Sequence, residues 1–220
     1  MYIKKSTVIF SFIFLVTSYL AFAQSRPDAQ ASYRSGRNFE NQGKPVEAAE
    51  SYNEAIRICQ DEIKNGIATM DSYAVLTATL RRQRKFTEVI SSGNEALKIN
   101  TDYRIIETMG EAHFYLGNFS NSLQCMQRYT NQLPQGDSAS VAYFFIGEIY
   151  RAQKKFNYAD IAYTTAVKLT PTSALWWFRL GQVRESLGNN QSALEAYNKA
   201  LQIDPGYSNA QEAVAKIKRT

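Results

Sequence analysis

Apolar and small residues recur at helical spacing over most of this 220-residue chain. They stand three and four residues apart, which places them on one face of an α-helix. The clearest stretch contains Trp177, Leu180 and Gly181, then Ala193, Tyr197 and Ala200, and ends with Pro205. A polar run at 188–190 separates the two apolar sets and indicates a turn. Residues 174–207 therefore predict a pair of helices joined by a short loop.

The same unit occurs 34 residues upstream with the same internal spacing. Its members there are Tyr143, Ile146, Gly147, Ala159, Tyr163, Ala166 and Pro171. A third copy has Ile106, Met109, Gly110, Ser122, Met126, Tyr129 and Pro134. One helix pair cannot bury such stripes by itself, so we expect successive pairs to stack and to share a continuous core.

Two further copies in the N-terminal half match less well. Residues 29–62 keep Gly36, Phe39, Ala48, Tyr52 and Ala55. Residues 70–103 keep Tyr73, Leu76, Val89 and Ala96, but Gly93 and Thr101 replace the aromatic residue and the proline. The sequence thus predicts five repeats and a terminal helix at 208–220 that covers the last of them. The repeats span 29–62, 70–103, 103–136, 140–173 and 174–207.

This order of small, aromatic and proline positions resembles the tetratricopeptide repeat family. The resemblance extends over nearly all of residues 24–220. It implies an all-α fold, a right-handed superhelical solenoid of helix-turn-helix repeats with a C-terminal capping helix. Because such a fold serves many functions, it does not itself name a partner.

The first 23 residues have the composition of a secretory signal peptide. Two lysines precede an apolar stretch from Val8 to Leu20, and Ala21-Phe22-Ala23 provides a cleavage pattern. The stretch is shorter than the roughly 20 residues that a membrane-spanning helix needs. We therefore expect an exported protein, periplasmic or secreted, that is soluble after residues 1–23 are removed.

Composition narrows the candidate chemistry. With 25 Lys and Arg against 20 Asp and Glu, the net charge of +5 is too small for a dedicated nucleic-acid binder. One histidine, His113, and two cysteines, Cys59 and Cys125, supply little material for a metal site or a disulfide framework. The cysteines fall two repeats apart, farther than the ~7 Å that a disulfide allows, so both thiols should be free. His113 takes a position that faces its partner helix, so we expect no catalytic residue, no metal, no cofactor and no enzymatic activity.

In proteins that this sequence resembles, the first helix of each repeat lines the inner face of the solenoid. Transferring those positions to the last three repeats gives a candidate partner-binding groove. Its residues are Phe114, Val141, Phe144, Glu148, Arg151, Leu175, Phe178 and Gln182. An apolar floor with a charged rim is typical of a protein or peptide interface. We expect removal of Phe144 and Phe178 to weaken binding at little cost in stability; the alternative is that these rings pack between repeats.

Basic residues gather in two of the turns between helices. They are Arg81, Arg82, Arg84 and Lys85 in one turn, and Arg151, Lys154 and Lys155 in another. Equivalent turns line up along one edge of a solenoid, so these residues could form a positive stripe that faces an acidic partner or anionic lipid. Simple solvation is the favoured alternative because salt screens exposed charges, and contact with a membrane surface therefore carries little weight.

Together these features favour a non-enzymatic extracytoplasmic scaffold that binds a protein or an extended peptide in its groove, with a complex of the cell envelope as one possible setting. The alternative is a structural protein that forms a homo-oligomer through its N-terminal repeats. Ala74, Ala78 and Gly93 stand there where large side chains are expected. An enzyme or a receptor for a small solute is least favoured, because no enclosed polar pocket can be recognised.

Overall fold

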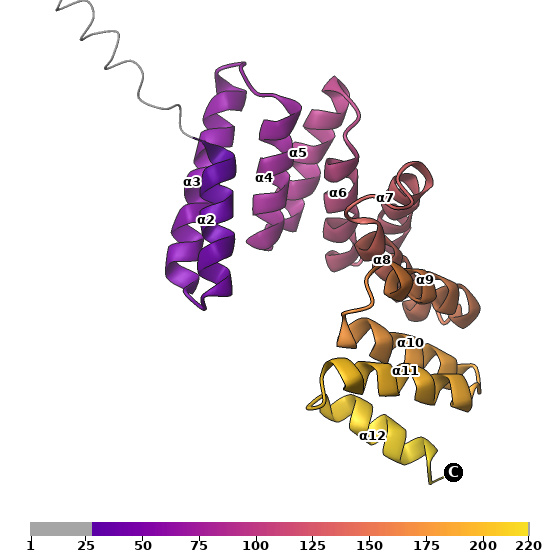
Figure 1. The fold of residues 1–220 in the computed structure, drawn as a ribbon. Helices are drawn as coiled ribbons and strands as arrows, with labels where there is room; N and C mark the ends of the chain where they lie inside the picture. Colours follow the sequence, from indigo (N-terminus) through magenta and orange to yellow (C-terminus); the bar gives the residue numbers. More distant parts are fainter. Residues whose placement is uncertain (1–27, 220) are drawn as a thin grey trace, which may run out of the picture. The chain divides into compact units, whose positions relative to one another are not determined.

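The computed structural model describes residues 28–219, and all the regular secondary structure in this range is helical (Figure 1). The chain divides into two compact units, one ending at Ile67 and one beginning at Ala68. The predicted signal peptide at 1–23 lies outside the described residues. Between residues 28 and 219, no helix combines the length and the apolar character needed to cross a bilayer.

The N-terminal unit is a pair of helices, α2 (Ala29–Asn41) and α3 (Pro45–Lys64). The Asp28 side chain accepts a hydrogen bond from the backbone N–H of Ala31 and so caps the start of α2. Pro45 occupies the first turn of α3, where its missing N–H costs nothing. Gly36 lets the two helices approach closely, because a Cβ there would lie 2.5 Å from the Tyr52 ring.

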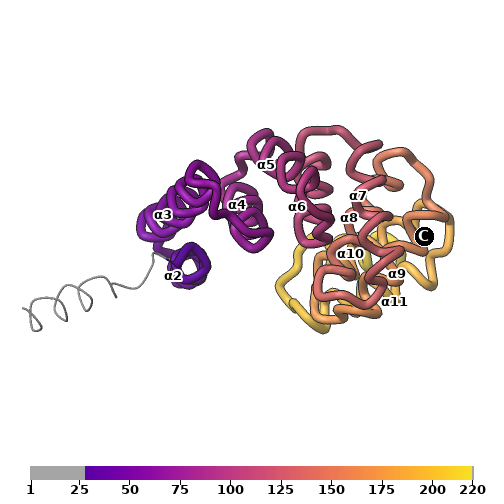
Figure 2. The backbone as a smooth tube through the Cα atoms, turned by 90° about the horizontal axis from the view of Figure 1, so that it is seen from above, coloured from indigo at the N-terminus to yellow at the C-terminus, as the bar shows by residue number. Residues whose placement is uncertain are grey.

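The C-terminal unit contains four helix pairs and a last helix. Its helices are α4 (Met70–Arg82), α5 (Phe86–Ile99), α6 (Tyr103–Tyr115), α7 (Phe119–Gln132), α8 (Ala139–Ala152), α9 (Phe156–Leu169), α10 (Ala174–Ser186), α11 (Asn190–Ile203) and α12 (Ser208–Ile217). Within this unit each helix packs against the next along the chain (Figures 1 and 2). We call α4, α6, α8 and α10 the first helices and α5, α7, α9 and α11 the second helices; α2 and α3 are the corresponding pair of the N-terminal unit.

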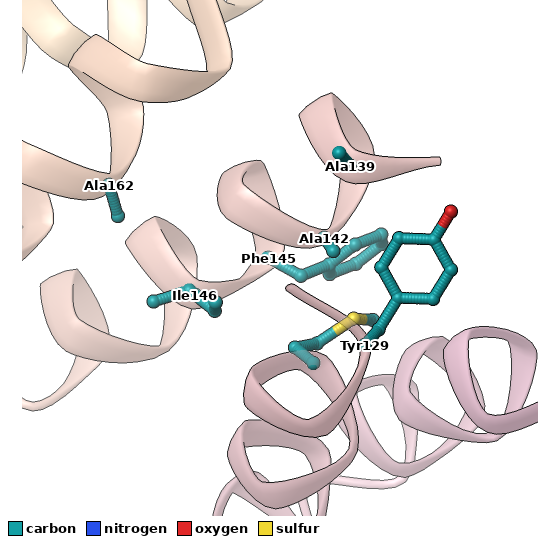
Figure 3. Packing of buried hydrophobic residues seen from close by; sticks show 7 residues of the cluster. Tyr129, Ala139, Ala142, Phe145, Ile146 and Ala162 are labelled. Atoms are coloured by element: carbon teal, nitrogen blue, oxygen red, sulfur yellow. The ribbon is translucent and has the colours of Figure 1, made fainter. Parts of the chain in front are cut away.

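Apolar clusters join neighbouring pairs of the C-terminal unit. In one of them, Phe145 and Ala142 of α8 face Tyr129 of α7 (Figure 3). Ala162 of α9 closes the same cluster. The next cluster joins α9, α10 and α11, and the last one includes Ala210 and Val214 of α12. Burial of these side chains from several helices supplies the stability that a single pair lacks.

Within a helix pair, a glycine of the first helix faces a tyrosine ring of the second helix. A Cβ on Gly147 would lie 2.7 Å from the Tyr163 ring, and one on Gly181 would lie 2.5 Å from the Tyr197 ring. These contacts match the one in the N-terminal unit. Gly93, which replaces the aromatic residue in α5, is covered from α6 instead, because Met109 Sδ would lie 2.4 Å from a Cβ there.

Candidate functional site

The first helices of the C-terminal unit carry a buried carboxylate at the contact between α8 and α10. Glu148 accepts a hydrogen bond from Arg151 Nη2 at 2.7 Å and another from the Tyr163 hydroxyl. Arg179 Nε of α10 lies 3.1 Å from the same carboxylate. We call these four residues the α8–α10 site. One carboxylate meets two guanidinium groups here, so the site carries a net positive charge.

Hydrogen bonding and burial set the protonation states of Arg151 and Tyr163. The hydrogen bond between Arg151 and Glu148 raises the pKa of Arg151, so the guanidinium stays charged. Burial, followed by the charge of Glu148, raises the pKa of Tyr163, so the hydroxyl stays protonated and remains a donor. Side-chain exposures of 34% for Arg151 and 29% for Arg179 leave both cations partly open to solvent.

An open hollow lies beside this site, between α10 and α12. It is lined by Arg179, Gln182, Glu185, Asn209, Glu212 and Lys216, with Phe178 and Tyr197 below. Glu185 accepts hydrogen bonds from the Tyr197 hydroxyl at 2.8 Å and from Lys216 Nζ at 2.7 Å. The bond to Lys216 lowers the pKa of Glu185, which favours its charged form. The hollow therefore offers amide groups and charges of both signs.

A second buried group lies between α4 and α6. Glu107 and Glu111 of α6 are each 6% exposed, and Arg81 Nη1 of α4 donates to Glu111 at 3.1 Å. Burial, followed by the charge and hydrogen bonding of Glu111, raises the pKa of Glu107 well above its usual range. We call these three residues the α4–α6 site. Its two carboxyl groups share one cation.

Aromatic residues complete the α8–α10 site. Phe144 is half-buried and stacks on Trp176, with ring centroids 5.1 Å apart and planes 16° apart. The Trp176 ring therefore packs against the preceding repeat. Leu175 beside it is 42% exposed.

Other residues of the predicted groove contribute to packing. Phe114 and Val141 are half-buried and lie against the cluster of α7, α8 and α9. The Phe114 ring lies 5.1 Å from that of Phe145. Gln182 is half-buried and accepts a hydrogen bond from Arg179 Nη1. Of the predicted groove residues, the structure places Phe144, Glu148, Arg151, Leu175 and Gln182 on one face. Glu148 is buried there and is not part of a solvated rim.

Phe178 is a core residue, which corrects its prediction as a dispensable anchor. It is 6% exposed and belongs to the cluster that joins α10, α11 and α12. Its ring centroid lies 5.6 Å from that of Tyr197 and 5.1 Å from that of Tyr207. Removing this side chain leaves a cavity, so its loss must lower stability as well as any binding.

The predicted basic edge is smaller than the sequence indicated. Arg81 and Arg151 point to the buried carboxylates described above and are not free turn residues. Arg82 is half-buried. The Arg84 guanidinium lies 5.6 Å from the ring centroids of both Phe86 and Tyr115. The exposed residues of the predicted set are Arg84, Lys85, Lys154 and Lys155, and four cations on two turns make a weak stripe.

The remaining candidate residues give no reactive site. Cys59 and Cys125 are free, and burial raises the pKa of both thiols, to about 12 for Cys59. Burial lowers the pKa of His113, which favours its neutral form. Among residues 28–219, no three His, Cys, Asp or Glu side chains are placed to hold a metal ion.

Sequence reasoning missed two cations of this face. Arg179 lies one residue beyond a position transferred from the family, and only the fold shows that it reaches Glu148. The ammonium group of Lys216 pairs with Glu185 while 72% of the side chain stays exposed. No periodic signal in the sequence marks either contact, because each cation and its carboxylate lie on helices of different repeats or on the last helix.

Comparison with known proteins gives the family. Sequence models of the tetratricopeptide repeat match residues 16–63, 140–173 and 174–207. The human protein O-mannosyl-transferase TMTC1 is 24% identical over 84% of this chain, and the peroxisomal targeting signal receptor of Kluyveromyces lactis is 29% identical over 49% of it. The chain spans about a fifth of the length of these curated relatives.

Solved structures agree on the fold. A MamA double mutant superposes with a TM-score of 0.63 at 14% identity, over 80% of this chain and 94% of that chain. YrrB, described as a tetratricopeptide repeat protein with an unusual peptide-binding site, gives a TM-score of 0.57 at 16% identity, over 89% and 96%. A chain of the APC/C hetero-tetramer Cut9-Hcn1 gives a TM-score of 0.70 at 15% identity, over 88% of this chain and 36% of that chain. The predicted all-α solenoid is confirmed, and the chain belongs to the tetratricopeptide repeat family.

Proposed function

We propose that this protein is a non-enzymatic scaffold that binds a segment of a protein partner along the first-helix face of α8, α10 and α12. The observation that carries the proposal is the α8–α10 site, where a buried carboxylate holds two partly exposed guanidinium groups next to an exposed leucine and an aromatic stack. Charged donors beside apolar anchors suit an extended peptide that carries both apolar and acidic side chains.

Preorganisation explains why such a face binds. Arg151 and Arg179 are held by Glu148 before a ligand arrives, so less side-chain freedom is lost on binding. Their net positive charge leaves capacity for a ligand carboxylate. The description of YrrB as a peptide-binding protein and that of the yeast relative as a receptor for a targeting signal support a peptide ligand.

Location and repeat number belong to the same proposal. The sequence of residues 1–23 supports export to the periplasm or the exterior, and five helix pairs support five repeats. The absence of a clustered reactive site among the described residues is compatible with a scaffold. Self-assembly through the N-terminal repeats remains the second candidate, and the half-buried Ala74 and Ala78 of α4 are the observation that favours it.

Peptide selection tests the scaffold. A displayed peptide library would be selected against the chain without residues 1–23, and affinities of the selected peptides would be measured by fluorescence polarisation. Leu175→Asp should weaken binding about tenfold, which corresponds to ~1.4 kcal/mol. Ile203→Asp is the matched control, because Ile203 is 39% exposed but lies on the second helix α11.

The control should change affinity less than twofold. Equal effects of the two substitutions, or failure of any peptide to bind, would contradict a peptide groove on this face. Circular dichroism of both variants would verify that each remains folded.

A further inference from the structure

The outward-facing row of the second helices changes character at one helix. Counted from the start of each second helix, the third and sixth residues are exposed or nearly so in all five. In four of them these residues are polar: Glu47 and Glu50, Glu88 and Ser91, Asn121 and Gln124, Ser192 and Glu195. In α9 they are Tyr158 and Ile161. A pair of large apolar side chains therefore replaces a polar pair at an equivalent place.

Tyr158 and Ile161 are open to solvent. They are 59% and 65% exposed, and they lie three residues apart on one face of α9. The Tyr158 ring has a contact with Tyr150, with centroids 5.2 Å apart, which fixes one side of it. Lys154 and Lys155, both exposed, immediately precede α9. This patch is apolar at its centre and positive at one end.

The N-terminal unit offers the complementary surface. Helix α3 exposes Val46, at 66%, next to Glu47 and Glu50, while the exposed Lys44 at the start of the helix lies over the Phe39 ring. Its surroundings are acidic as well, since residues 28–67 carry seven acidic and five basic side chains. Residues 68–220 have the opposite balance, with thirteen acidic and seventeen basic side chains. Opposite charge on the two surfaces favours their encounter.

We propose that Tyr158 and Ile161 form a docking surface for α3 of a second copy of this chain. Val46 packs on the apolar pair, and Glu47 and Glu50 lie against Lys154 and Lys155. The two copies use different surfaces, so the contact is heterologous and produces either a closed ring or an open row of molecules. Since the apolar area is small, the association is weak and depends on concentration.

This contact does not depend on the peptide groove, because it uses the outward row of α9 and α3. Sedimentation velocity on the chain without residues 1–23, which retains every described residue, measures it over a concentration series. The weight-average mass should rise with concentration. The double substitution Tyr158→Ser, Ile161→Glu, which copies the polar pair of α11, should lower the association constant at least tenfold. Gln124→Glu at the equivalent place on α7 is the matched control and should leave it unchanged.

Charge reversal identifies the occupant. The double substitution Glu47→Lys, Glu50→Lys should abolish association with the unaltered chain. Mixing this variant with a Lys154→Glu, Lys155→Glu variant should restore it, because opposite charges then meet again. Circular dichroism would verify that each variant is folded.

Three outcomes would overturn the proposal. They are a chain that stays monomeric at all concentrations, association that survives loss of the apolar pair, and charge reversal without rescue. Sedimentation of the chain with vesicles of phosphatidylcholine and phosphatidylglycerol tests whether the patch binds an anionic lipid surface instead of a second copy. Vesicle binding by a monomeric chain that requires Tyr158 and Ile161 would assign the patch to an anionic lipid surface and would overturn docking of a second copy.

Discussion

At the α8–α10 site one buried carboxylate meets two guanidinium groups and a phenol, whereas at the α4–α6 site two buried carboxyl groups share one guanidinium. Glu148 and Glu111 occupy the equivalent place on their helices, eight residues beyond the start of their predicted repeats. The same slot therefore has more cations than carboxyl groups in one repeat and more carboxyl groups than cations in the other.

The cations reach this slot from different directions. Glu111 takes Arg81 from the preceding first helix, and Glu148 takes Arg179 from the following one. Glu185 pairs with Lys216 of the last helix, α12. The first two pairs each join two first helices and the third joins α10 to α12, so these contacts fasten a repeat to its neighbour or to the last helix. The contrast teaches that the neighbouring repeat helps to set the number of cations around a buried carboxyl group, in addition to the partners from its own repeat.

Removing the shared carboxylate tests the comparison most strongly. Glu148→Gln should lower the free energy of unfolding by about 2–3 kcal/mol, because the guanidinium groups of Arg151 and Arg179 lose the negative charge with which both are paired. Glu111→Gln at the equivalent place should change it by less than about 1 kcal/mol, because it also relieves repulsion with Glu107. Urea denaturation at pH 7 measures both, and equal losses would remove the distinction between the sites.

Removing a cation should reverse the order. Arg81→Met removes the guanidinium group that pairs with the buried Glu111 and should cost about 2 kcal/mol at pH 7. Arg179→Met should cost about 1 kcal/mol, because Glu148 keeps Arg151 and Tyr163. The same denaturation experiment compares them. A larger loss for Arg179→Met would show that contact with α10 matters more than charge balance.

A pH titration tests the raised pKa of Glu107 at the α4–α6 site. The pKa of Glu107 is raised in the folded protein, so the folded state binds more protons than the unfolded state above the ordinary pKa of 4.5. Stability contributed by protonated Glu107 is thus present at low pH and lost as pH rises from 4.5 through the raised value. Glu107→Gln should be less stable than the unaltered chain, or equal to it, near pH 4.5, and should gain by about 1 kcal/mol relative to it as pH rises.

Thermal unfolding of both proteins from pH 4.5 to pH 8 measures this difference. Carboxylates with lowered pKa values, such as Asp102 and Glu185, weaken both proteins equally at low pH and cancel in the comparison. Parallel curves over the whole range would contradict an uncompensated Glu107.

Local periodicity predicted the elements well and the charges poorly. The spacing of Gly181 and Tyr197 follows from packing within one helix pair, so it can be read from sequence. Burial of Glu148 and Phe178 depends on side chains of the next pair, Arg179 for the first and Tyr207 for the second. Such contacts join residues that are about 30 positions apart in the sequence, and a local hydrophobic pattern does not predict contacts at that separation. The fold class was therefore predictable, whereas the charge balance of the site was not.

The smallest expected effect concerns the turns that follow the two sites. Arg84 and Lys154 both have φ of +58°, in a place where Gly43, Gly117 and Gly188 stand in the other turns. A left-handed conformation is strained for a residue with a side chain, so Lys154→Gly should stabilise the protein by about 0.5–1 kcal/mol. Arg84→Gly should gain less stability, because it also removes the contacts of the guanidinium group with Phe86 and Tyr115.

Lys155→Gly is the matched control, since φ is −86° at Lys155 and glycine relieves no strain there. Urea denaturation should rank Lys154→Gly above Arg84→Gly and Lys155→Gly below both. The reverse order of the first two would mean that the cation–π contacts of Arg84 do not stabilise the fold.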